Sequence, residues 1–357
     1  MQLDFPRRGV VRRFALSDTG QRDGYPTPWA MNVRLEDTLT ERLRGGSFTG
    51  ISAASRPESI VYRDRTLTFS DNAVTASRVG DSSDTTLSSD YSDMIRPVLF
   101  QFSEAAEVGE DVVALVPHKD NYLLGFSASE TWVQQGDPNG GTRKRVSDQV
   151  GIIGPDAWCV AHDTVYFLSS HGLYSVGADG SGLSALSEDI VPEDLTSVAD
   201  AACTLTYQHS DRGVYVHKTG TDWFVDVERG GFWPFYTSTA ASHLLMGPFH
   251  LGQRNSFGRL LNLHGTTAAG SADVTWRIVA GDSAETAAAN GKAAITAALA
   301  GGDYSSYFSH SGTWSAGRSH LAYPRTRAMW FCVWLSSASD WAYEATAMTV
   351  EPSGKWR

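Results

Sequence analysis

The stretch DVVALVPHKDNYLLGFSASETWVQQGDPNGG, residues 111–141, decides the fold class of this chain. It predicts three short apolar strands, at Val112–Pro117, Tyr122–Ser127 and Glu130–Gln135. Residues 119–121, Lys-Asp-Asn, supply a turn between the first two strands, and the Asp-Pro-Asn-Gly-Gly run at 137–141 ends the third. Short strands joined by tight turns are typical of a β-sandwich, a barrel or a propeller.

The same plan recurs along the chain. DTVYFLSSHGLYSVGADGSG (163–182) and GVYVHKTGTDWFVDVERGGFW (213–233) each contain an apolar strand, a small polar turn, a second apolar strand and a Gly-rich exit. A loose repeat of roughly 40 to 50 residues with four strands is what a propeller blade requires. We therefore predict an all-β protein, with residues 56–357 forming a β-propeller of about five to six blades. A two-sheet sandwich remains the alternative.

The composition agrees with a packed all-β chain. Of 357 residues, 41% are hydrophobic, 11% are aromatic and 19% are charged, and there are 34 Gly, 13 Pro and 11 Trp. Such chains build many short strands with large rings packed between sheets. The formal charge of −11 argues against gripping nucleic acid, which needs a basic surface.

Residues 1–55 differ from this pattern and are predicted to be an extended N-terminal arm. Four arginines cluster in PRRGVVRRF (6–14), and prolines in GYPTPWAMNV (24–33) favour an extended backbone. The next stretch, NVRLEDTLTERLRGGSFTGI (32–51), looks too polar and too Gly-rich to be core. We expect it to lie across the body or a neighbouring subunit. The predicted assembly residues are Arg7, Arg8, Arg12, Arg13, Arg34, Arg42 and Arg44.

One stretch predicts a helix. GDSAETAAANGKAAITAALAGG, residues 281–302, is rich in alanine, the best helix former. Asp282 or Ser283 can cap its start, and Gly301-Gly302 can end it. Asn290-Gly291 is expected to divide it into two short pieces. The low charge of this insertion indicates that it packs on something, such as a neighbouring subunit.

Motifs for catalysis, cofactors or metals are missing from the sequence. There is no phosphate-binding loop, no His-Glu-x-x-His and no Gly-x-Ser-x-Gly. Cys159 and His162 lie three residues apart without a second such pair, and His209 and His217 flank a predicted hairpin across which they could face each other. Core packing or an ordinary sheet pair explains both better than a metal site does. We expect no enzyme, no cofactor and no metal.

Two further patterns leave alternatives open. GDSSDTTLSSDYSD (80–93) could hold a hard cation through its carboxylates, although a solvated Ser- and Asp-rich loop is the simpler interpretation. SADVTW (271–276) and SASETW (127–132) are degraded forms of the Asp-box found in sialidase-like propellers. A glycan-binding or sialidase-like propeller is therefore the alternative function.

Other features bear on the compartment. Cys159, Cys203 and Cys332 lie far apart in apolar surroundings, which predicts buried free thiols in a reducing compartment. The N-terminus has no continuous apolar segment of the signal-peptide kind, and AMWFCVWL (328–335) is too short to span a bilayer. We expect a protein made in a cytoplasm that does not insert into a membrane.

Several stretches together resemble a known family, the β-propeller tail nozzle or packaged-DNA stabilisation proteins of short-tailed bacteriophages. They are residues 32–51, VVALVPHKDNYLLGFSASETWVQQGDP (112–138), QVGIIGPDAWCVAHDTVYFLSSHGLYSV (149–176), and the late VTWRIVAGD and GTWSAGRSH. In the family, an Asn-Val-Arg start leads to an Arg-Gly-Gly-Ser turn, and a Gly-Ile-Ile-Gly-Pro segment precedes a strand ending near FLS-x-x-GLY. The resemblance runs in order from about residue 25 to residue 330.

The resemblance implies a virion structural protein of the tail. Such proteins form a ring, commonly a homohexamer, below the portal and its adaptor, and carry tail fibre, spike or needle proteins. Double-stranded DNA passes through the lumen without specific binding. Six chains of this charge would carry roughly −66, which repels phosphate and keeps DNA from sticking. A net acidic chain is therefore compatible with conducting DNA.

Overall fold

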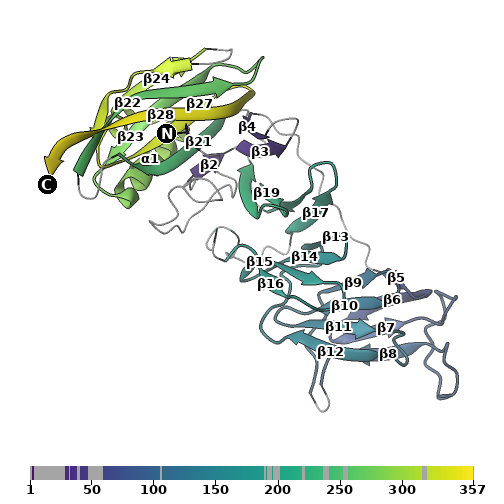
Figure 1. Cartoon of the computed structure of the whole chain (residues 1–357). Helices are drawn as coiled ribbons and strands as arrows, with labels where there is room; N and C mark the ends of the chain where they lie inside the picture. Colours follow the sequence, from purple (N-terminus) through teal and green to yellow (C-terminus); the bar gives the residue numbers. More distant parts are fainter. Residues whose placement is uncertain are drawn as a thin grey trace. The chain divides into compact units, whose positions relative to one another are not determined.

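A computed structural model describes residues 2–3, 29–31, 33–37, 41–46, 59–104, 107–188, 190, 195, 202–218, 222–235, 241–251, 256–315 and 320–356. The chain divides into two compact units. The terminal unit comprises residues 1–50 and 221–357, and the middle unit comprises residues 51–220. Figure 1 shows the strands and the helix of both units.

The middle unit consists of antiparallel sheets that follow one another along the chain. Three of them have four strands each, in the orders β5-β6-β7-β8, β12-β11-β10-β9 and β13-β14-β15-β16, and a hairpin β17–β18 follows. The strands are β5 (Ile60–Tyr62), β6 (Arg65–Ser70), β7 (Ala73–Ala76), β8 (Val98–Gln101), β9 (Ala114–His118), β10 (Tyr122–Phe126), β11 (Thr131–Gln135), β12 (Thr142–Ser147), β13 (Trp158–Ala161), β14 (Thr164–Ser169), β15 (Gly172–Gly177), β16 (Ser184–Ala185), β17 (Thr204–Gln208) and β18 (Gly213–His217).

Tight turns join the first two strands of these sheets. The first hairpins of the first two sheets turn at Arg63-Asp64 and Lys119-Asp120, and all four residues have φ between +47° and +55°. Two consecutive residues of positive φ match the right-handed twist of the strands they join. The turn predicted at residues 119–121 is confirmed.

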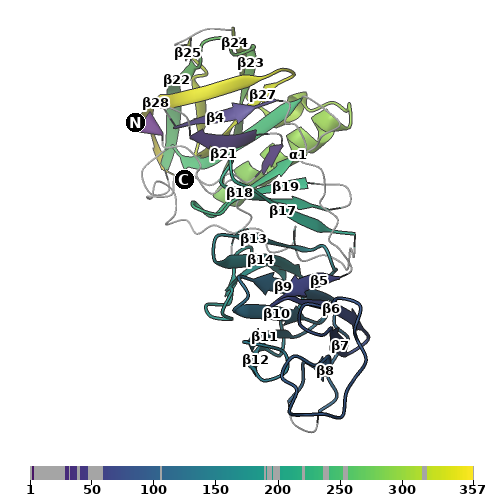
Figure 2. The same ribbon diagram turned by 90° about the vertical axis from the view of Figure 1, so that its right-hand side faces the viewer.

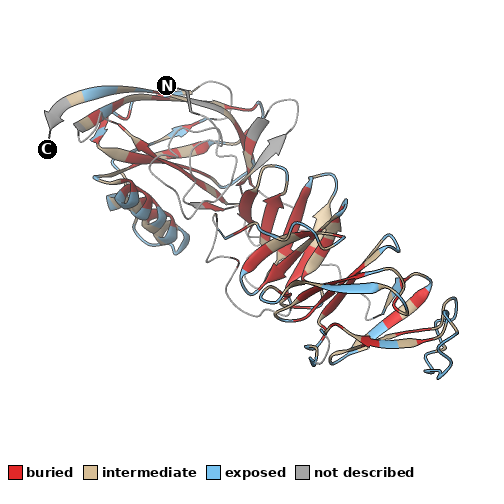
Figure 3. Cartoon of the chain, turned by 60° about the horizontal axis from the view of Figure 1, so that its bottom comes forward, coloured by how far each residue is buried: buried red, intermediate tan, exposed pale blue. Residues whose placement is uncertain are grey.

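Successive sheets of the middle unit share apolar cores. The core between the first two sheets holds ten buried residues: Tyr62, Leu67, Val74, Ala76, Phe100, Phe102, Val112, Leu115, Leu123 and Trp132. Gly125 belongs to this interface because a Cβ atom there would lie 2.3 Å from the Phe102 ring. Phe126 and Phe167, with ring centroids 4.8 Å apart, join the second sheet to the third. The middle unit is therefore a series of sheets packed one on the next, whose central strands are mostly red in Figure 3.

The terminal unit contains a five-stranded and a seven-stranded antiparallel sheet, and a hairpin β19–β20. The five-stranded sheet has the order β2-β21-β27-β23-β24. The other has the order β25-β22-β28-β4-β3, with β1 beside β28 and β26 beside β22. The strands are β1 (Gln2–Leu3), β2 (Trp29–Met31), β3 (Val33–Asp37), β4 (Glu41–Gly45), β19 (Asp222–Asp226), β20 (Gly231–Phe235), β21 (Ser242–His250), β22 (Ser256–Thr267), β23 (Val274–Gly281), β24 (His310–Trp314), β25 (His320–Ala322), β26 (Thr326–Ala328), β27 (Trp330–Ser337) and β28 (Trp341–Trp356).

Aromatic side chains join these two sheets face to face. Trp314 of β24 stacks on Tyr343 of β28 with ring centroids 6.0 Å apart. The buried Trp341 Nε1 donates a hydrogen bond of 2.6 Å to Ser242 Oγ on β21. Figure 2 shows β28 running beside β22 and over the strands that lie between them and α1. This part of the chain is a two-sheet sandwich, the arrangement expected only as the alternative.

The predicted helix is a single helix, α1 (Ala284–Leu299), followed by a short 3₁₀ turn, η2 (Ser305–Tyr307). Ser283 Oγ accepts a hydrogen bond from the Thr286 amide, which confirms the expected cap. The expected break at Asn290-Gly291 is wrong. Gly291 is buried in mid-helix, where a Cβ atom would lie 2.6 Å from Leu245 Cδ2, so glycine lets the helix approach β21 closely. α1 packs on its own sheet through Ala287, Ala294 and Ile295, while its outward face is pale blue in Figure 3.

The all-β prediction is confirmed, with one helix among the described residues. The blade count is not confirmed, and residues 241–356 form larger sheets than the four-stranded blades expected through residue 357. Within the predicted arm, the described residues lie in strands β1–β4. Val33 and Leu43 are fully buried. The expectation that residues 32–51 are too polar to be core is therefore wrong for these two positions.

Candidate assembly surfaces

The predicted assembly arginines fall into two groups. Arg7, Arg8, Arg12 and Arg13 lie outside the described residues. Arg34, Arg42 and Arg44 lie in the hairpin β3–β4, where the backbones of Arg34 and Arg44 pair directly. The structure therefore makes Arg34 and Arg44 direct neighbours. Arg42 lies on the same strand pair, where its register partner is Glu36.

Both described arginine side chains contact the terminal unit itself. The Arg34 guanidinium lies 5.3 Å from the Phe224 ring centroid, a cation–π distance. Arg44 Nη2 lies 3.8 Å from Asp340 Oδ2, and both side chains are partly exposed. An ion pair this long at the surface is worth about 0–1 kcal/mol. The expected pairing of Arg44 with an acidic group is confirmed, within its own chain.

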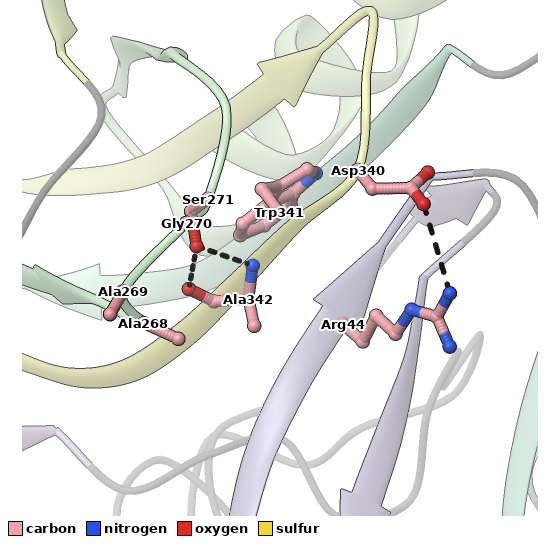
Figure 4. Close-up of a pocket in the computed structure, with 8 residues that line it drawn as sticks. All are labelled: Arg44, Ala268, Ala269, Gly270, Ser271, Asp340, Trp341 and Ala342. Carbon is pink, nitrogen blue, oxygen red and sulfur yellow. Dashed lines mark hydrogen bonds and ion pairs between the residues drawn. The ribbon is translucent and has the colours of Figure 1, made fainter.

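A small open pocket of about 170 Å³ lies beside this ion pair (Figure 4). Its walls come from β4, the 268–271 turn and the start of β28. Ser271 Oγ accepts a hydrogen bond from the Ala342 amide and donates one to the Ala342 carbonyl, so this hydroxyl is occupied. The lining residues are Arg44, Ala268, Ala269, Gly270, Ser271, Asp340, Trp341 and Ala342. Its side chains are thus one cation, one carboxylate, the Trp341 ring and small residues.

The buried hairpin had a sequence signal that the arm interpretation missed. Apolar and charged residues alternate in Val33-Arg34-Leu35-Glu36, and Leu43 stands between two arginines. This is the period of a strand with one buried face. Leu35 and Leu43 are direct partners in the register, so the alternation of the two strands matches.

In the middle unit, the first hairpin turns of successive sheets contact one another. The Arg63 amide donates a hydrogen bond of 3.0 Å to Asp120 Oδ1 in the next turn. Asp163 in the third turn in turn pairs with His118 at 3.0 Å and with Lys119. The Lys119 contact, more than any other, holds the pKa of the Asp163 carboxyl below its usual value. Polar contacts thus join the turns in the same order as the sheets.

The histidine pairs do not form sites. Cys159 is buried in β13, whereas His162 is exposed in the following turn with its ring 6.0 Å from that of Tyr207. His217 pairs with Thr204 at one end of the hairpin β17–β18, and His209 lies in the turn at the other end. The idea that His209 and His217 face each other is therefore wrong. Among the described residues, no group of three or more metal-ligating side chains occurs.

The Asp-box fragments have structural roles. Ser127 Oγ donates a hydrogen bond of 2.6 Å to Glu110 Oε2, and Trp132 is buried in the first core. In the second fragment, Ser271 bonds the Ala342 backbone as described above. Neither fragment presents a polar and aromatic surface of the kind a sugar needs.

The long loop that joins β7 to β8, residues 77–97, is held by a buried arginine. Arg65 is fully buried and donates hydrogen bonds of 2.7 Å to the carbonyls of Ser77 and Arg96. A third bond, of 3.1 Å, goes to the Met94 carbonyl. Arg65 also forms a two-point ion pair with Asp137, on the turn after β11. The Arg65 side chain therefore holds the backbone at both ends of this loop.

Charge is divided unevenly between the two units. Residues 51–220 hold 24 acidic and 11 basic side chains, a formal charge of −13. The remaining residues hold 16 acidic and 18 basic side chains, a formal charge of +2. Residues 146–211 alone have ten acidic side chains and no lysine or arginine. The whole acidic excess of the chain therefore belongs to the middle unit.

The residues on which the family resemblance rests include a connection between sheets. The Gly-Ile-Ile-Gly-Pro segment, 151–155, joins the second sheet to the third. The Ile152 amide bonds the Ser127 carbonyl and the Ile153 amide bonds the Leu168 carbonyl. A Cβ atom at Gly151 would lie 2.2 Å from the Ser127 carbonyl oxygen, so the close approach requires glycine. The segment fixes how consecutive sheets follow each other.

Comparison with known proteins finds weak structural likenesses. No known protein family and no curated protein matches the chain. Among solved structures, the extracellular domain of a one-component system of B. thetaiotaomicron has a TM-score of 0.35 at 11% identity, and the match covers 58% of this chain and 27% of that one. The AfRom2 CNH domain has a TM-score of 0.29 at 11% identity, and the match covers 87% and 95%. Likenesses this weak carry no argument about function.

The three cysteines are buried and none of them forms a disulfide, as expected. No helix in the described part of the chain is long and apolar enough to cross a membrane.

Proposed function

We propose that this chain is a virion structural protein, a subunit of the tail nozzle of a short-tailed bacteriophage. In this role it forms a ring, commonly a homohexamer, below the portal and adaptor, retains the packaged genome and conducts it on ejection. Tail fibre, spike or needle proteins are the partners at its far end. The observation that carries the proposal is the resemblance to nozzle proteins that runs in order through most of the chain.

The structure supplies a physical reason for the motifs of that resemblance. Val33 and Arg34 of the first stretch and Arg44 and Gly45 of the second lie in the hairpin β3–β4, and the Gly-Ile-Ile-Gly-Pro segment joins two sheets. Such residues set an architecture and contribute no chemistry. A protein whose recurring motifs are architectural suits a role in which shape and contacts between copies matter.

The division of charge also supports the role. DNA in a channel must be contained without being bound, and negative charge on the protein repels phosphate. The middle unit has the required sign, since its formal charge is −13. We propose that the middle unit contributes the surface nearest the genome in the assembled ring.

The experiment that tests the function is a mass measurement on the purified full chain, alone and mixed with a portal or adaptor ring. The proposal expects a closed oligomer or a stoichiometric complex with one of these rings. A stable monomer that ignores both rings but binds or hydrolyses a glycan would favour the sialidase-like alternative, which the two Asp-box fragments first suggested.

A further inference from the structure

The loop between β7 and β8 exposes large apolar side chains. Four of them stand within nine residues: Leu87, Tyr91, Met94 and Ile95, and Leu99 follows on β8. Tyr91 is 78% exposed, Met94 63% and Leu87 55%. We call these five residues the loop patch; the loop is the pale blue segment at the far right of Figure 3. Clustered exposed apolar residues of this size are typical of interaction surfaces.

The loop patch sits on a fixed backbone. The Met94 carbonyl accepts hydrogen bonds from Arg65 Nη2 and from Asn139 Nδ2, each 3.1 Å long. The Ile95 carbonyl accepts one from the Val79 amide, and Arg78 pairs with Asp93 at 3.0 Å. The backbone that carries Met94 and Ile95 is therefore fixed before any partner arrives, which lowers the entropy lost on binding.

Four carboxylates lie in the same loop as the loop patch, and the Arg96 guanidinium lies 4.2 Å from the Tyr91 ring centroid. Asp81, Asp84, Asp90 and Asp93 lie in the loop, and residues 79–95 contain no lysine or arginine. Hydrogen bonds from Ser83 and Ser92 hold the pKa values of Asp81 and Asp90 below their usual value, so both stay ionised near neutral pH. A partner for this surface should combine apolar and basic side chains.

The chain contains one segment of that composition. Residues 5–14, FPRRGVVRRF, alternate four arginines with Phe5, Val10, Val11 and Phe14. Every ten-residue stretch with four lysines or arginines lies within residues 4–16. The segment belongs to the terminal unit, of charge +2, whereas the loop patch belongs to the middle unit, of charge −13. Opposite charge steers the association of such surfaces.

We propose that residues 5–14 of one copy dock on the loop patch of a second copy. The contact is head to tail, because the two surfaces differ, and repetition of such a contact builds a ring when the rotation closes. The inference rests on the ring-forming role proposed above for its biological meaning, but the contact can be measured without a ring.

The test uses a fluorescent peptide of residues 4–16 and the full-length chain with Arg7, Arg8, Arg12 and Arg13 changed to Gln, whose own segment no longer competes. We expect saturable binding by fluorescence anisotropy that weakens as salt increases. Adding Tyr91→Ser and Met94→Ser should weaken binding at least tenfold. These changes leave the charge unaltered, so they separate docking on the loop patch from general attraction of a cationic peptide. Val108→Ser, at an exposed valine of the same unit, is the matched control and should have no effect.

A mixing experiment distinguishes a second copy from the same chain. The mixing partner is a patch variant that has Tyr91→Ser and Met94→Ser in the wild-type background and so retains its arginines. The arginine variant retains its loop patch, so the two should form a dimer through one intact contact. Unchanged peptide binding after Tyr91→Ser and Met94→Ser are added to the arginine variant, or no dimer on mixing, would overturn the proposal. If the peptide binds the loop patch but the wild-type protein binds neither a portal ring nor an adaptor ring, the contact is supported and the nozzle function is contradicted. If wild-type rings form and the patch variant assembles equally well, the function stands and this contact is wrong.

Discussion

Arg65 and Asp137 form a two-point ion pair between the first sheet of the middle unit and the turn that follows β11. Arg65 Nε lies 3.1 Å from Asp137 Oδ2, and Nη2 lies 3.2 Å from Oδ1. Arg65 is fully buried, and its remaining hydrogens go to loop carbonyls. A single side chain therefore links two sheets and the loop that carries the loop patch.

Replacing Arg65 by Ala should destabilise the middle unit. The change leaves Asp137 and three carbonyls without their buried donor, and breaking a buried pair of this kind costs about 3 to 5 kcal/mol. Chemical denaturation followed by tryptophan fluorescence measures the free energy of unfolding. Hydrogen exchange should become faster at residues 94–96.

Arg212→Ala, at an exposed turn of the same unit, should change the stability by less than about 0.5 kcal/mol. Equal stability of the two variants would contradict the role given to Arg65.

Replacing Gly291 by Ala should destabilise the terminal unit, although the same change in an ordinary helix gains about 1 kcal/mol. The new methyl group would lie 2.6 Å and 2.8 Å from the two terminal carbons of the buried Leu245. Overpacking of a core typically costs about 1 to 3 kcal/mol. Gly302→Ala, beyond the end of α1 where the nearest atom is 3.4 Å away, is the control. A higher melting temperature for Gly291→Ala would show that α1 does not approach β21 this closely.

The terminal unit should lose stability in acid through His243. Burial, together with the nearby Arg277 charge, lowers the pKa of His243 to about 4. Its Nδ1 is 3.2 Å from the Trp334 indole nitrogen, which donates to the neutral ring. Below pH 6.5 this histidine is protonated in the unfolded chain but stays neutral in the folded chain. The free energy of unfolding therefore decreases as the pH falls from about 6.5 to about 4, by up to about 3 kcal/mol.

His243→Gln should flatten this part of the pH profile. The measurement is the free energy of unfolding at several pH values for the wild type, for this variant and for His171→Gln, an exposed histidine of the middle unit. The wild type and the His171 variant should show parallel profiles. If the His243 variant loses as much stability between pH 7 and pH 4 as the wild type, the buried neutral histidine is not the cause.

Local features of this fold follow from the sequence, whereas its long-range pairings do not. The turns at Arg63-Asp64 and Lys119-Asp120 each contain an aspartate, a residue that tolerates positive φ. The helix follows from its alanines and its serine cap. By contrast, Gly45 pairs with Trp341 across almost the whole chain, and no local pattern marks that register. The sandwich of residues 241–356 depends on such pairings, which is why a repeat of short strands suggested blades there instead.

The candidate surfaces show the same limit. The arginine-rich segment and the acidic loop are visible in the sequence as composition. The exposure of Tyr91 and Met94 is not, because apolar residues in a loop ordinarily predict a buried anchor. In this loop the buried anchor is the Arg65 side chain. The burial of Arg65 depends on its ion pair with Asp137, which lies 72 residues further along the chain. Only the folded structure shows that the side chains of Tyr91 and Met94 are exposed to solvent.

The position of the buried hairpin determines which N-terminal deletion tests assembly. The sequence alone suggests removing residues 1–44 as a dispensable arm. That deletion removes β2, β3 and most of β4, with the buried Met31, Val33 and Leu43, so we expect it to unfold the terminal unit. Removing residues 1–28 takes away the four clustered arginines and the two-residue strand β1, and keeps β2, β3 and β4. The shorter deletion should retain the wild-type melting temperature to within a few degrees and lose self-association in sedimentation velocity. A folded, fully assembled protein after the shorter deletion would exclude the arginine segment from the interface, and a stable fold after the longer one would contradict the place of β2–β4 in the core.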